Sequence, residues 1–442
     1  MRAKPSSPDL LPRGEGSLDA SSILLPTEGH SVGMKSSRHW FAILVLAVAT
    51  LLVAGAVMHA QAQPQSKGRQ PVQKTTSDQS NAAFETAVRL GDEARQADQL
   101  PQALDHYATA LKIRPNWKEG WWNTGAIFYE QDHYTEARDA FRNLVSLDAN
   151  NGAAWGMLGL CEFQTREYDR AIVSLLHGRS LGLSSNQELE SVVRYHAALL
   201  YIHFEQFEIA FDVLSEFLRA GNNSPKVVQA FGLAILRMPY FDTEIPSDQR
   251  ELILMAGQAG IGMAARRPEA AKAAFDQLMA RYPNAPNVHY AYGVFLLNQD
   301  SDAALKEFKR ELEISPQHQP SMVQMAFEYL KRDDYNTALP LAEKAVQLNP
   351  KMFPARNVLG RILLQLGQID RAIKELEEGA RLAPTSPEMH YALGRAYRRA
   401  GREEDAKRET ALFQKLEEEF NTRRNAELTG SGSDNNQPKS KP

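Results

Sequence analysis

The chain of 442 residues contains a single cysteine, Cys161. One thiol excludes an internal disulfide framework and any cysteine-based zinc site, so Cys161 is expected to be a small apolar residue of a helix. An excess of one charge is also lacking, because 50 Lys and Arg face 54 Asp and Glu. A net charge of −4 is too balanced to predict nucleic-acid binding through phosphate neutralisation.

Sequence patterns of common catalytic sites are absent as well. The chain has no G-x-S-x-G, Walker, H-E-x-x-H or Rossmann glycine pattern, and the glycines of residues 257–262 have the wrong spacing. His196 and His203 fall on one face of a predicted helix, but two turns separate them by about 10 Å. That distance is too large for one ion without further ligands. We therefore expect no enzyme, no cofactor and no metal site.

One long apolar run, residues 41–57, lies near the N-terminus behind Lys35, Arg38 and His39. Its length is just sufficient to span a bilayer with little tilt. Positive charge precedes the run and is missing from the flank that follows it. This asymmetry predicts that the rest of the chain lies outside the cytoplasmic membrane.

The small-x-small sequence at residues 60–62 is typical of a signal-peptidase site. Residues 1–62 are therefore predicted to be a signal peptide or an uncleaved N-terminal membrane anchor, and Met34 is a second candidate for the translation start. Residues 63–83, rich in Gln, Pro, Ser and Lys at their beginning, are predicted to be a disordered linker.

Alanines recur at a constant spacing in two parts of the chain, and the prolines Pro316, Pro350 and Pro384 keep the same spacing. A fixed period of this kind indicates stacked supersecondary units. Apolar residues at three- and four-residue intervals, with breaks at Gly, Pro or Asn, predict two antiparallel helices per period. The recurring alanines are Ala103, Ala137 and Ala171, then Ala304, Ala338, Ala372 and Ala406.

Within each period, the order of Trp, Leu-Gly, aromatic, Ala and Pro resembles the tetratricopeptide repeat (TPR) family, whose motif begins W-x2-L-G-x2-Y. The second unit supplies Trp121, Gly125, Phe128, Ala137 and Phe141 at the spacing of the family. The third unit departs from the pattern, because Glu162 replaces an aromatic residue and Leu183 replaces a proline.

The resemblance implies an all-α fold, a right-handed superhelical α-solenoid of about nine TPR helix hairpins, with an irregular segment after the fourth. The predicted parts are an N-terminal TPR array at 84–224, an irregular helix and loop at 225–250, and a C-terminal array with a capping helix at 251–420. Residues 421–442 are predicted to be a disordered tail. The irregular segment is hypothesised to be a joint between two rigid half-arrays.

TPR arrays hold extended peptides or partner helices in a concave groove lined by the first helix of each hairpin. By the register of the family, each candidate protein-binding residue could contact a partner or could pack between neighbouring first helices. The candidates are Trp122, Asn123, Tyr129, Phe163, Tyr195, Tyr290, Phe327, Asn357, Arg361, Tyr391, Arg395 and Arg398.

The Lys/Asn clamp with which one TPR subclass binds the carboxyl tail of heat-shock chaperones is not reproduced here. Asn123 occupies one position of the clamp, but the other cationic and amide positions hold Val88, Asp92, Ala153 and Met157. Chaperone-tail binding is therefore disfavoured.

These features predict a non-enzymatic TPR scaffold, periplasmic or anchored outside the cytoplasmic membrane, whose partner is a protein or an extended peptide. Nucleic acid is not an expected partner, and the membrane is expected to be contacted only through the N-terminal segment if that segment is uncleaved. The alternatives are a periplasmic chaperone and an accessory protein of envelope assembly or glycan handling.

Overall fold

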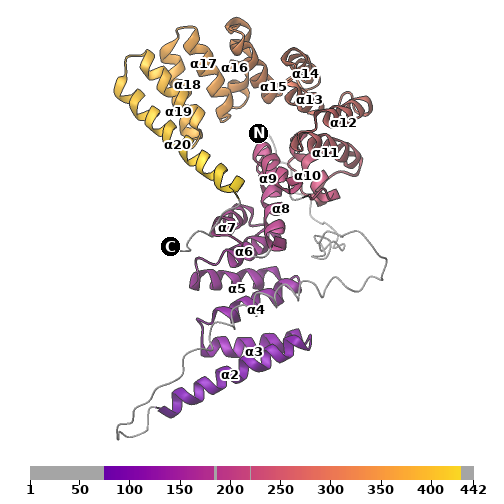
Figure 1. Ribbon diagram of the computed structural model, residues 1–442, viewed down its shortest axis with the longest axis vertical. Helices are drawn as coiled ribbons and strands as arrows, with labels where there is room; N and C mark the ends of the chain where they lie inside the picture. The colour runs from indigo at the N-terminus through magenta and orange to yellow at the C-terminus, as the bar shows by residue number, and fades with distance from the viewer. Residues whose placement is uncertain (1–73, 184–186, 220, 430–442) are drawn as a thin grey trace, which may run out of the picture. The chain divides into compact units, whose positions relative to one another are not determined.

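The computed structural model describes residues 74–183, 187–219 and 221–429, and Figure 1 shows them as paired helices. Within these ranges the secondary structure consists of 19 α-helices and two short 3₁₀ helices, without strands. None of the helices in the described ranges is long and apolar enough to cross a membrane. The predicted signal peptide or anchor at 1–62, with Met34, lies outside the described residues.

Contacts divide the chain into two compact units. Among the described residues, the first unit contains those up to Ala230 together with Met238–Ile245, and the second contains Phe231–Arg237 and those from Pro246 to Thr429. Four hairpins form the first unit: α2 (Lys74–Gln96) with α3 (Leu100–Ile113), α4 (Lys118–Glu130) with α5 (Tyr134–Leu147), α6 (Gly152–Gln164) with α7 (Tyr168–Leu181), and α8 (Gln187–His203) with α9 (Phe207–Arg219).

Five hairpins form the second unit, so the predicted count of about nine is confirmed for the described residues. Helix α10 (Pro225–Ile235) and the 3₁₀ helices η2 (Asp242–Glu244) and η3 (Ser247–Gln249) stand outside the hairpins, where the period is lost. The five hairpins are α11 (Arg250–Ala264) with α12 (Pro268–Arg281), α13 (Val288–Leu296) with α14 (Ser301–Ile314), α15 (Gln319–Lys331) with α16 (Tyr335–Leu348), α17 (Phe353–Gln365) with α18 (Ile369–Leu382), and α19 (Pro387–Arg399) with α20 (Glu403–Thr429).

Two predicted boundaries differ from the structure. Helix α2 begins at Lys74, inside the predicted linker 63–83, and α20 continues to Thr429, inside the predicted tail 421–442. Neither extension contains Gly or Pro, the residues that most strongly oppose a helix, so nothing in the sequence ends either helix earlier. Gly430 follows directly after α20.

Glycines of the first helices allow the two helices of a hairpin to cross closely. A Cβ atom built on Gly159 would lie 2.7 Å from Leu175 Cγ and 2.9 Å from the backbone nitrogen of Leu175, which cannot move away easily. The same relation joins other first-helix glycines to a large side chain on the second helix of the same hairpin. These pairs are Gly91 with Tyr107, Gly125 with Phe141, Gly293 with Phe308 and Gly360 with Leu376.

The turns inside the hairpins share one backbone conformation. Eight of the nine described hairpins have a residue with positive φ after the first helix, and the next N–H bonds back to the carbonyl five residues earlier, as His133 does to Phe128 at 2.9 Å. This is the Schellman arrangement that ends a helix. The exception is the turn from α13 to α14, where Asp300 caps α14 instead. This turn has four residues, one more than the turns inside the other described hairpins. The same hairpin falls where the spacing of the prolines, from Pro283 to Pro316, is shorter than the spacing that follows it.

A side chain near the start of many first helices donates to a carbonyl six residues earlier, and this contact fixes the entry loop. Trp121 Nε1 bonds to Pro115 O at 2.8 Å, and Trp155 Nε1 bonds to Ala149 O at 2.9 Å. Where tryptophan is absent, other donors take its place. They are His289 to Pro283, Arg356 to Pro350 and His390 to Pro384, over 3.0, 2.8 and 2.9 Å.

We predict that Gly159→Ala destabilises the protein by about 1–3 kcal/mol through overpacking, although Gly→Ala in an open helix would stabilise it by about 1 kcal/mol. Equilibrium urea unfolding measures the change. Gly394→Ala is the matched control, because a Cβ atom there would approach nothing closer than 3.3 Å. Equal effects of the two substitutions would contradict the packing argument.

A second prediction concerns pH. His289 Nδ1 lies 2.6 Å from Glu307 Oε2 and Nε2 lies 3.0 Å from Pro283 O, so only the doubly protonated ring donates to both oxygens. The hydrogen bond to Glu307 is the main reason why the pKa of His289 is raised above its usual value of 6.5. The resulting stabilisation is therefore complete below pH 6.5 and is lost as the pH rises through the folded-state pKa.

Urea unfolding of the wild type and of His289→Gln at several pH values measures this contribution. The difference in unfolding free energy between the two proteins should shrink as the pH rises above neutrality. The contributions of the other histidines to the pH dependence are the same in both proteins, so they cancel in that difference. A constant difference across the pH range would show that His289 is not protonated in the folded state.

Candidate functional site

All twelve candidate residues lie on the first helices of hairpins, as the register predicted. Helix α4 carries Trp122, Asn123 and Tyr129, while α6, α8, α13 and α15 carry Phe163, Tyr195, Tyr290 and Phe327; α17 carries Asn357 and Arg361, and α19 carries Tyr391, Arg395 and Arg398. Their surroundings differ greatly.

Three of the candidates are buried, which argues against direct partner contact. Tyr129, Phe163 and Tyr290 are only 6%, 9% and 6% exposed. Tyr129 packs edge-on against Tyr134, and Tyr290 against His318. Phe163 is covered by Phe241, whose ring centroid lies 5.3 Å away. The irregular loop that carries Phe241 thus fills the space in front of Phe163.

Four further candidates are half-buried and already have contacts inside the array. Asn123 Oδ1 accepts a hydrogen bond from Arg95 at 2.9 Å, and Asn357 Nδ2 lies 3.2 Å from the sulfur of Met389. The rings of Trp122 and Tyr195 pack edge-on against Phe141 and Phe217, respectively. These contacts join helices within the array, so for these four residues they favour packing between helices over contact with a partner.

The remaining candidates are grouped at the C-terminal end of the second unit. Phe327, Arg361 and Arg395 occupy the same position of three successive first helices, one repeat apart. The Arg361 guanidinium lies over the Phe327 ring at 5.1 Å, and that of Arg395 lies 5.9 Å from the Tyr391 centroid. Tyr391 is 51% exposed. We call Phe327, Arg361, Tyr391 and Arg395 the Arg–aromatic surface.

The two arginines of this surface differ from most charged side chains of the described residues in having no ion-pair partner there. Within the described residues, neither guanidinium has a hydrogen bond or an ion pair. Helix α17 contains no Asp or Glu, and α19 contains only Glu388, in its first turn. Burial, together with the positive charge of Arg395, lowers the pKa of Arg361. Arg361 is thus a partly desolvated cation beside another cation.

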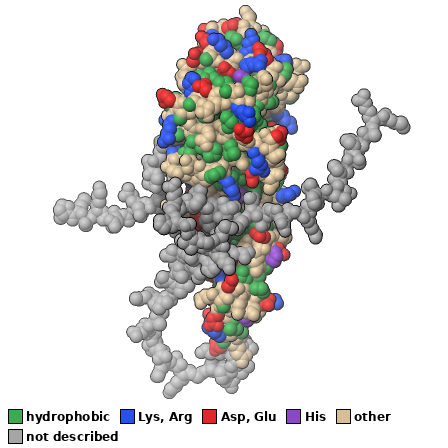
Figure 2. All heavy atoms as spheres, turned by 90° about the vertical axis from the view of Figure 1, so that its right-hand side faces the viewer, with side chains coloured by type: hydrophobic (Ala, Val, Ile, Leu, Met, Phe, Trp, Pro, Cys, Tyr) green, Lys and Arg blue, Asp and Glu red, His purple; other side chains and the backbone are tan. Residues whose placement is uncertain are grey.

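Four arginines on second helices and turns of the second unit are paired with carboxylates. The second helices and turns hold the ion pairs Arg310 with Glu313, Arg332 with Asp302, Arg371 with Glu343 and Arg381 with Glu378, at 2.5–2.8 Å. On the face of the molecule in Figure 2, basic and acidic side chains are correspondingly interspersed. The Arg–aromatic surface differs from these four sites in that its two arginines have no ion pair within the described residues and lie beside aromatic rings.

Arg398, the twelfth candidate, is exposed, and its Nη2 lies 3.5 Å from Thr410 Oγ1. Sequence reasoning did not include Lys331, whose Nζ lies 5.9 Å from the Phe327 ring centroid. Lys331 is one turn after Phe327, so its spacing could have revealed it. Its charge is compensated by Glu328, 2.8 Å away.

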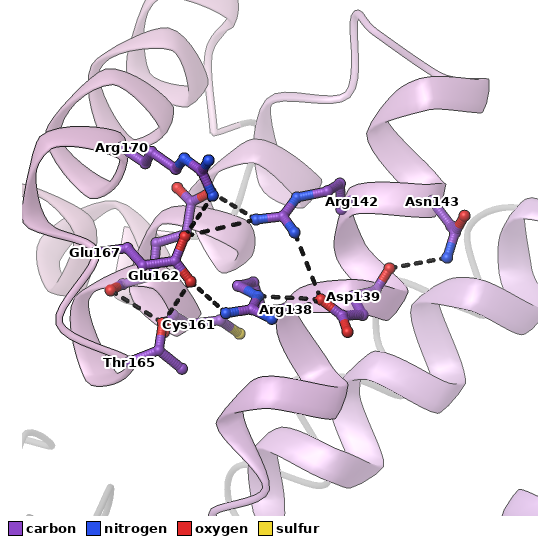
Figure 3. Close-up of polar contacts among 9 residues, drawn as sticks. All are labelled: Arg138, Asp139, Arg142, Asn143, Cys161, Glu162, Thr165, Glu167 and Arg170. Atoms are coloured by element: carbon purple, nitrogen blue, oxygen red, sulfur yellow. Dashed lines mark hydrogen bonds and ion pairs between the residues drawn. The ribbon is translucent and has the colours of Figure 1, made fainter.

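A polar network in the first unit, shown in Figure 3, is the other cluster of charged side chains that could carry chemistry. Glu162 replaces the usual aromatic residue; it accepts a 2.6 Å hydrogen bond from Ser174, and Arg142 lies 3.4 Å away. Arg138 and Arg170 hold Glu167. Every carboxylate of the network has a partner, so the network joins α5, α6 and α7 and offers no free group.

The electrostatics of this region support a structural role. Burial would raise the pKa of Glu167, but hydrogen bonds from Arg170 and Arg138 outweigh burial, and the pKa is lowered. Burial raises the pKa of the Cys161 thiol, together with the charge of Glu162. A buried thiol held in its protonated form is a poor nucleophile.

The histidine pair has no metal-binding geometry in the described residues, where no group of three or more His, Cys, Asp and Glu side chains could hold an ion. His203 stacks on Phe241 with centroids 4.7 Å apart. Burial lowers the pKa of His196 to about 4, and its Nδ1 bonds to the Val192 carbonyl at 2.8 Å. Both rings are packing elements.

Comparisons with known sequences agree with the fold. Two models described as tetratricopeptide repeat match the chain, one over residues 329–395 and the other over 88–151, 123–176 and 263–318. Together these matches include the helices that carry most of the candidates.

Curated relatives are similar over part of their length. Anaphase-promoting complex subunit 3 of Schizosaccharomyces pombe is 23% identical over 287 residues, which are 62% of this chain and 42% of that protein. Human protein O-mannosyl-transferase TMTC3 is 22% identical over 247 residues, 53% of this chain and 27% of that protein. The chain thus spans less than half of each of these relatives.

Among solved structures, MamA from Desulfovibrio magneticus RS-1 is 23% identical, with a TM-score of 0.35, and the match covers 38% of this chain and 96% of that one. The repeated hairpins, their glycine crossings and the matching family models lead to one conclusion. The chain is a tetratricopeptide-repeat protein.

Proposed function

We propose that the protein is a non-enzymatic scaffold outside the cytoplasmic membrane, which binds an extended segment of a partner protein along the first helices of its second unit. TPR domains generally bind proteins or peptides. The observation that carries the proposal is the Arg–aromatic surface, where Tyr391 is half exposed and two arginines lack acidic partners. Aromatic and Arg side chains are the residue types that most often anchor interfaces.

The absence of enzymatic activity is part of this proposal. It is supported by the engagement of the polar network around Glu162 in contacts between helices, and by family matches to repeats alone. A location outside the membrane is supported by the apolar run at 41–57 and by the basic residues before it.

The glycan-handling alternative has one observation in its favour, the similarity to protein O-mannosyl-transferase TMTC3. That similarity covers 27% of the human protein, and the same chain is similar to an anaphase-promoting complex subunit. Repeats shared by a transferase and by a subunit of the anaphase-promoting complex favour a common mode of binding rather than a common reaction.

We predict that a photo-cross-linking amino acid at position 391 of the full chain captures a partner protein, whereas the same amino acid at position 381 does not. Arg381 is an exposed residue of α18, a second helix, and is the matched control. Cross-linking followed by mass spectrometry identifies the captured protein. Equal capture at both positions, or none at 391, would refute binding through the first helices.

Tyr391→Ala is expected to weaken binding of the captured partner by about tenfold, as removal of an aromatic anchor does. A partner found by cross-linking is titrated against the wild type and the variant. Helicity measured by circular dichroism should be unchanged, because the Tyr391 ring is half exposed. Unchanged affinity would show that the ring only packs against Phe413, its neighbour on α20.

The location is tested by a reporter enzyme that is active only outside the cytoplasm, fused after residue 442 in a bacterial host. Activity is expected for the full chain and should be lost when residues 41–57 are deleted. An inactive full-chain fusion that is found only in the cytoplasmic fraction would contradict export.

A further inference from the structure

From the Arg–aromatic surface we infer the chemistry of the partner: an extended acidic peptide segment, in which carboxylates three residues apart bind Arg361 and Arg395. This inference rests on the proposed function and specifies its ligand. The argument begins with the two guanidinium groups.

Desolvating a cation without a partner costs free energy, and a second cation nearby adds to that cost. Arg361 is subject to both effects, since it is half-buried and senses the charge of Arg395. An incoming carboxylate would relieve both and would form charge-assisted hydrogen bonds with the guanidinium fork. The Arg–aromatic surface therefore favours the binding of an anion.

Each guanidinium group lies within cation–π distance of an aromatic ring. The Arg361 guanidinium lies 5.1 Å from the Phe327 centroid, and that of Arg395 lies 5.9 Å from the Tyr391 centroid. A guanidinium over a ring face keeps its N–H donors in the plane of the group, where they can bind an external acceptor. The exposed part of Tyr391 adds apolar area beside the charges. A ligand at this surface could therefore contact a guanidinium group and an aromatic ring together.

The spacing selects the form of the ligand. Packed neighbouring helices lie about 8–10 Å apart, and Arg361 and Arg395 occupy equivalent positions on α17 and α19, which are in contact. A polyproline II chain places every third side chain on the same side, at intervals of about 9 Å. An acidic residue at every third position would therefore present one carboxylate to each arginine. Such a chain also loses little conformational freedom on binding.

The charge of the surroundings supports a peptide of this kind. Helices α17 and α19 contribute four further basic side chains, Arg356, Arg398, Arg399 and His390, and a single acidic one, Glu388. Arg356 and His390 are engaged with Glu375 and Glu409, so the surplus positive charge lies toward the C-terminal end of α19. Acidic side chains along a peptide would meet little repulsion there.

The experiment uses the full chain and three fluorescein-labelled twelve-residue peptides. The first repeats Glu-Pro-Pro, the second repeats Gln-Pro-Pro, and the third has the same number of glutamates in adjacent pairs. Fluorescence anisotropy should show binding of the first peptide, weaker binding of the third and none of the second. Binding of the first peptide should weaken as the salt concentration rises.

Arg361→Gln and Arg395→Gln are each expected to weaken binding of the Glu-Pro-Pro peptide about tenfold, the usual loss when a charge-assisted hydrogen bond is removed. Arg371→Gln is the matched control, because Arg371 is an exposed arginine of α18 paired with Glu343. Its effect should be negligible. Arg361→Lys retains the charge without the fork and should give an intermediate affinity, which separates ligand binding from a folding defect.

Several results would overturn the inference: equal binding of the Glu and Gln peptides, no binding of either, or unchanged affinity of both Gln variants. Tight binding of a phosphoserine-Pro-Pro peptide without binding of the Glu peptide would also overturn it. So would dissociation of a dimer of this chain by Arg361→Gln, which would identify a second copy as the occupant. Cross-linking at position 391 without acidic preference would leave the proposed function standing and remove only this inference.

Discussion

The close crossing of the two helices in each hairpin is the constraint on which the rest of the structure depends. In five of the described hairpins a glycine of the first helix meets a large side chain of the second, and at Gly159 the contact reaches the backbone of Leu175. This approach leaves no room for a Cβ atom, so the large residue and the glycine must recur together. Because each hairpin hides only part of its apolar surface, the neighbouring hairpins must cover the remainder. This packing requirement explains the regular period of the sequence.

Elements that depend on this local crossing could be predicted from the sequence. The spacing of the recurring alanines and the order of Leu-Gly and aromatic positions identified the hairpins, and the lost period located α10 and the loop around Phe241. The left-handed turn residues were not predicted, since Asp132, Arg166 and Glu205 have no common side chain and only the backbone geometry is shared. The donors His289 and Arg356 were missed for a similar reason, because different side chains replace tryptophan in one hydrogen bond.

The candidate surface was predictable in register but not in exposure. The repeat places a residue on a first helix, yet its exposure depends on side chains from distant segments. Phe163 illustrates this point, since Phe241 of the irregular loop covers it. Tyr391 occupies the position of Asn357 one repeat later but is half exposed. Which arginine lacks a carboxylate likewise follows from three-dimensional pairing, and composition alone could not reveal it.

Charge is distributed within the second unit in a way that connects stability with binding. Second helices such as α18 satisfy their arginines locally, as Arg381 with Glu378 does, and exposed pairs of this kind contribute little free energy. On the first helices α17 and α19, Arg361 and Arg395 instead have no acidic partner among the described residues, at some cost to the folded state. The glycine crossings provide the packing that tolerates this cost. Arginines that are unpaired in the folded protein gain more binding free energy from a carboxylate ligand than arginines already paired with Asp or Glu. For this physical reason, the partner is expected to bind at this end of the array.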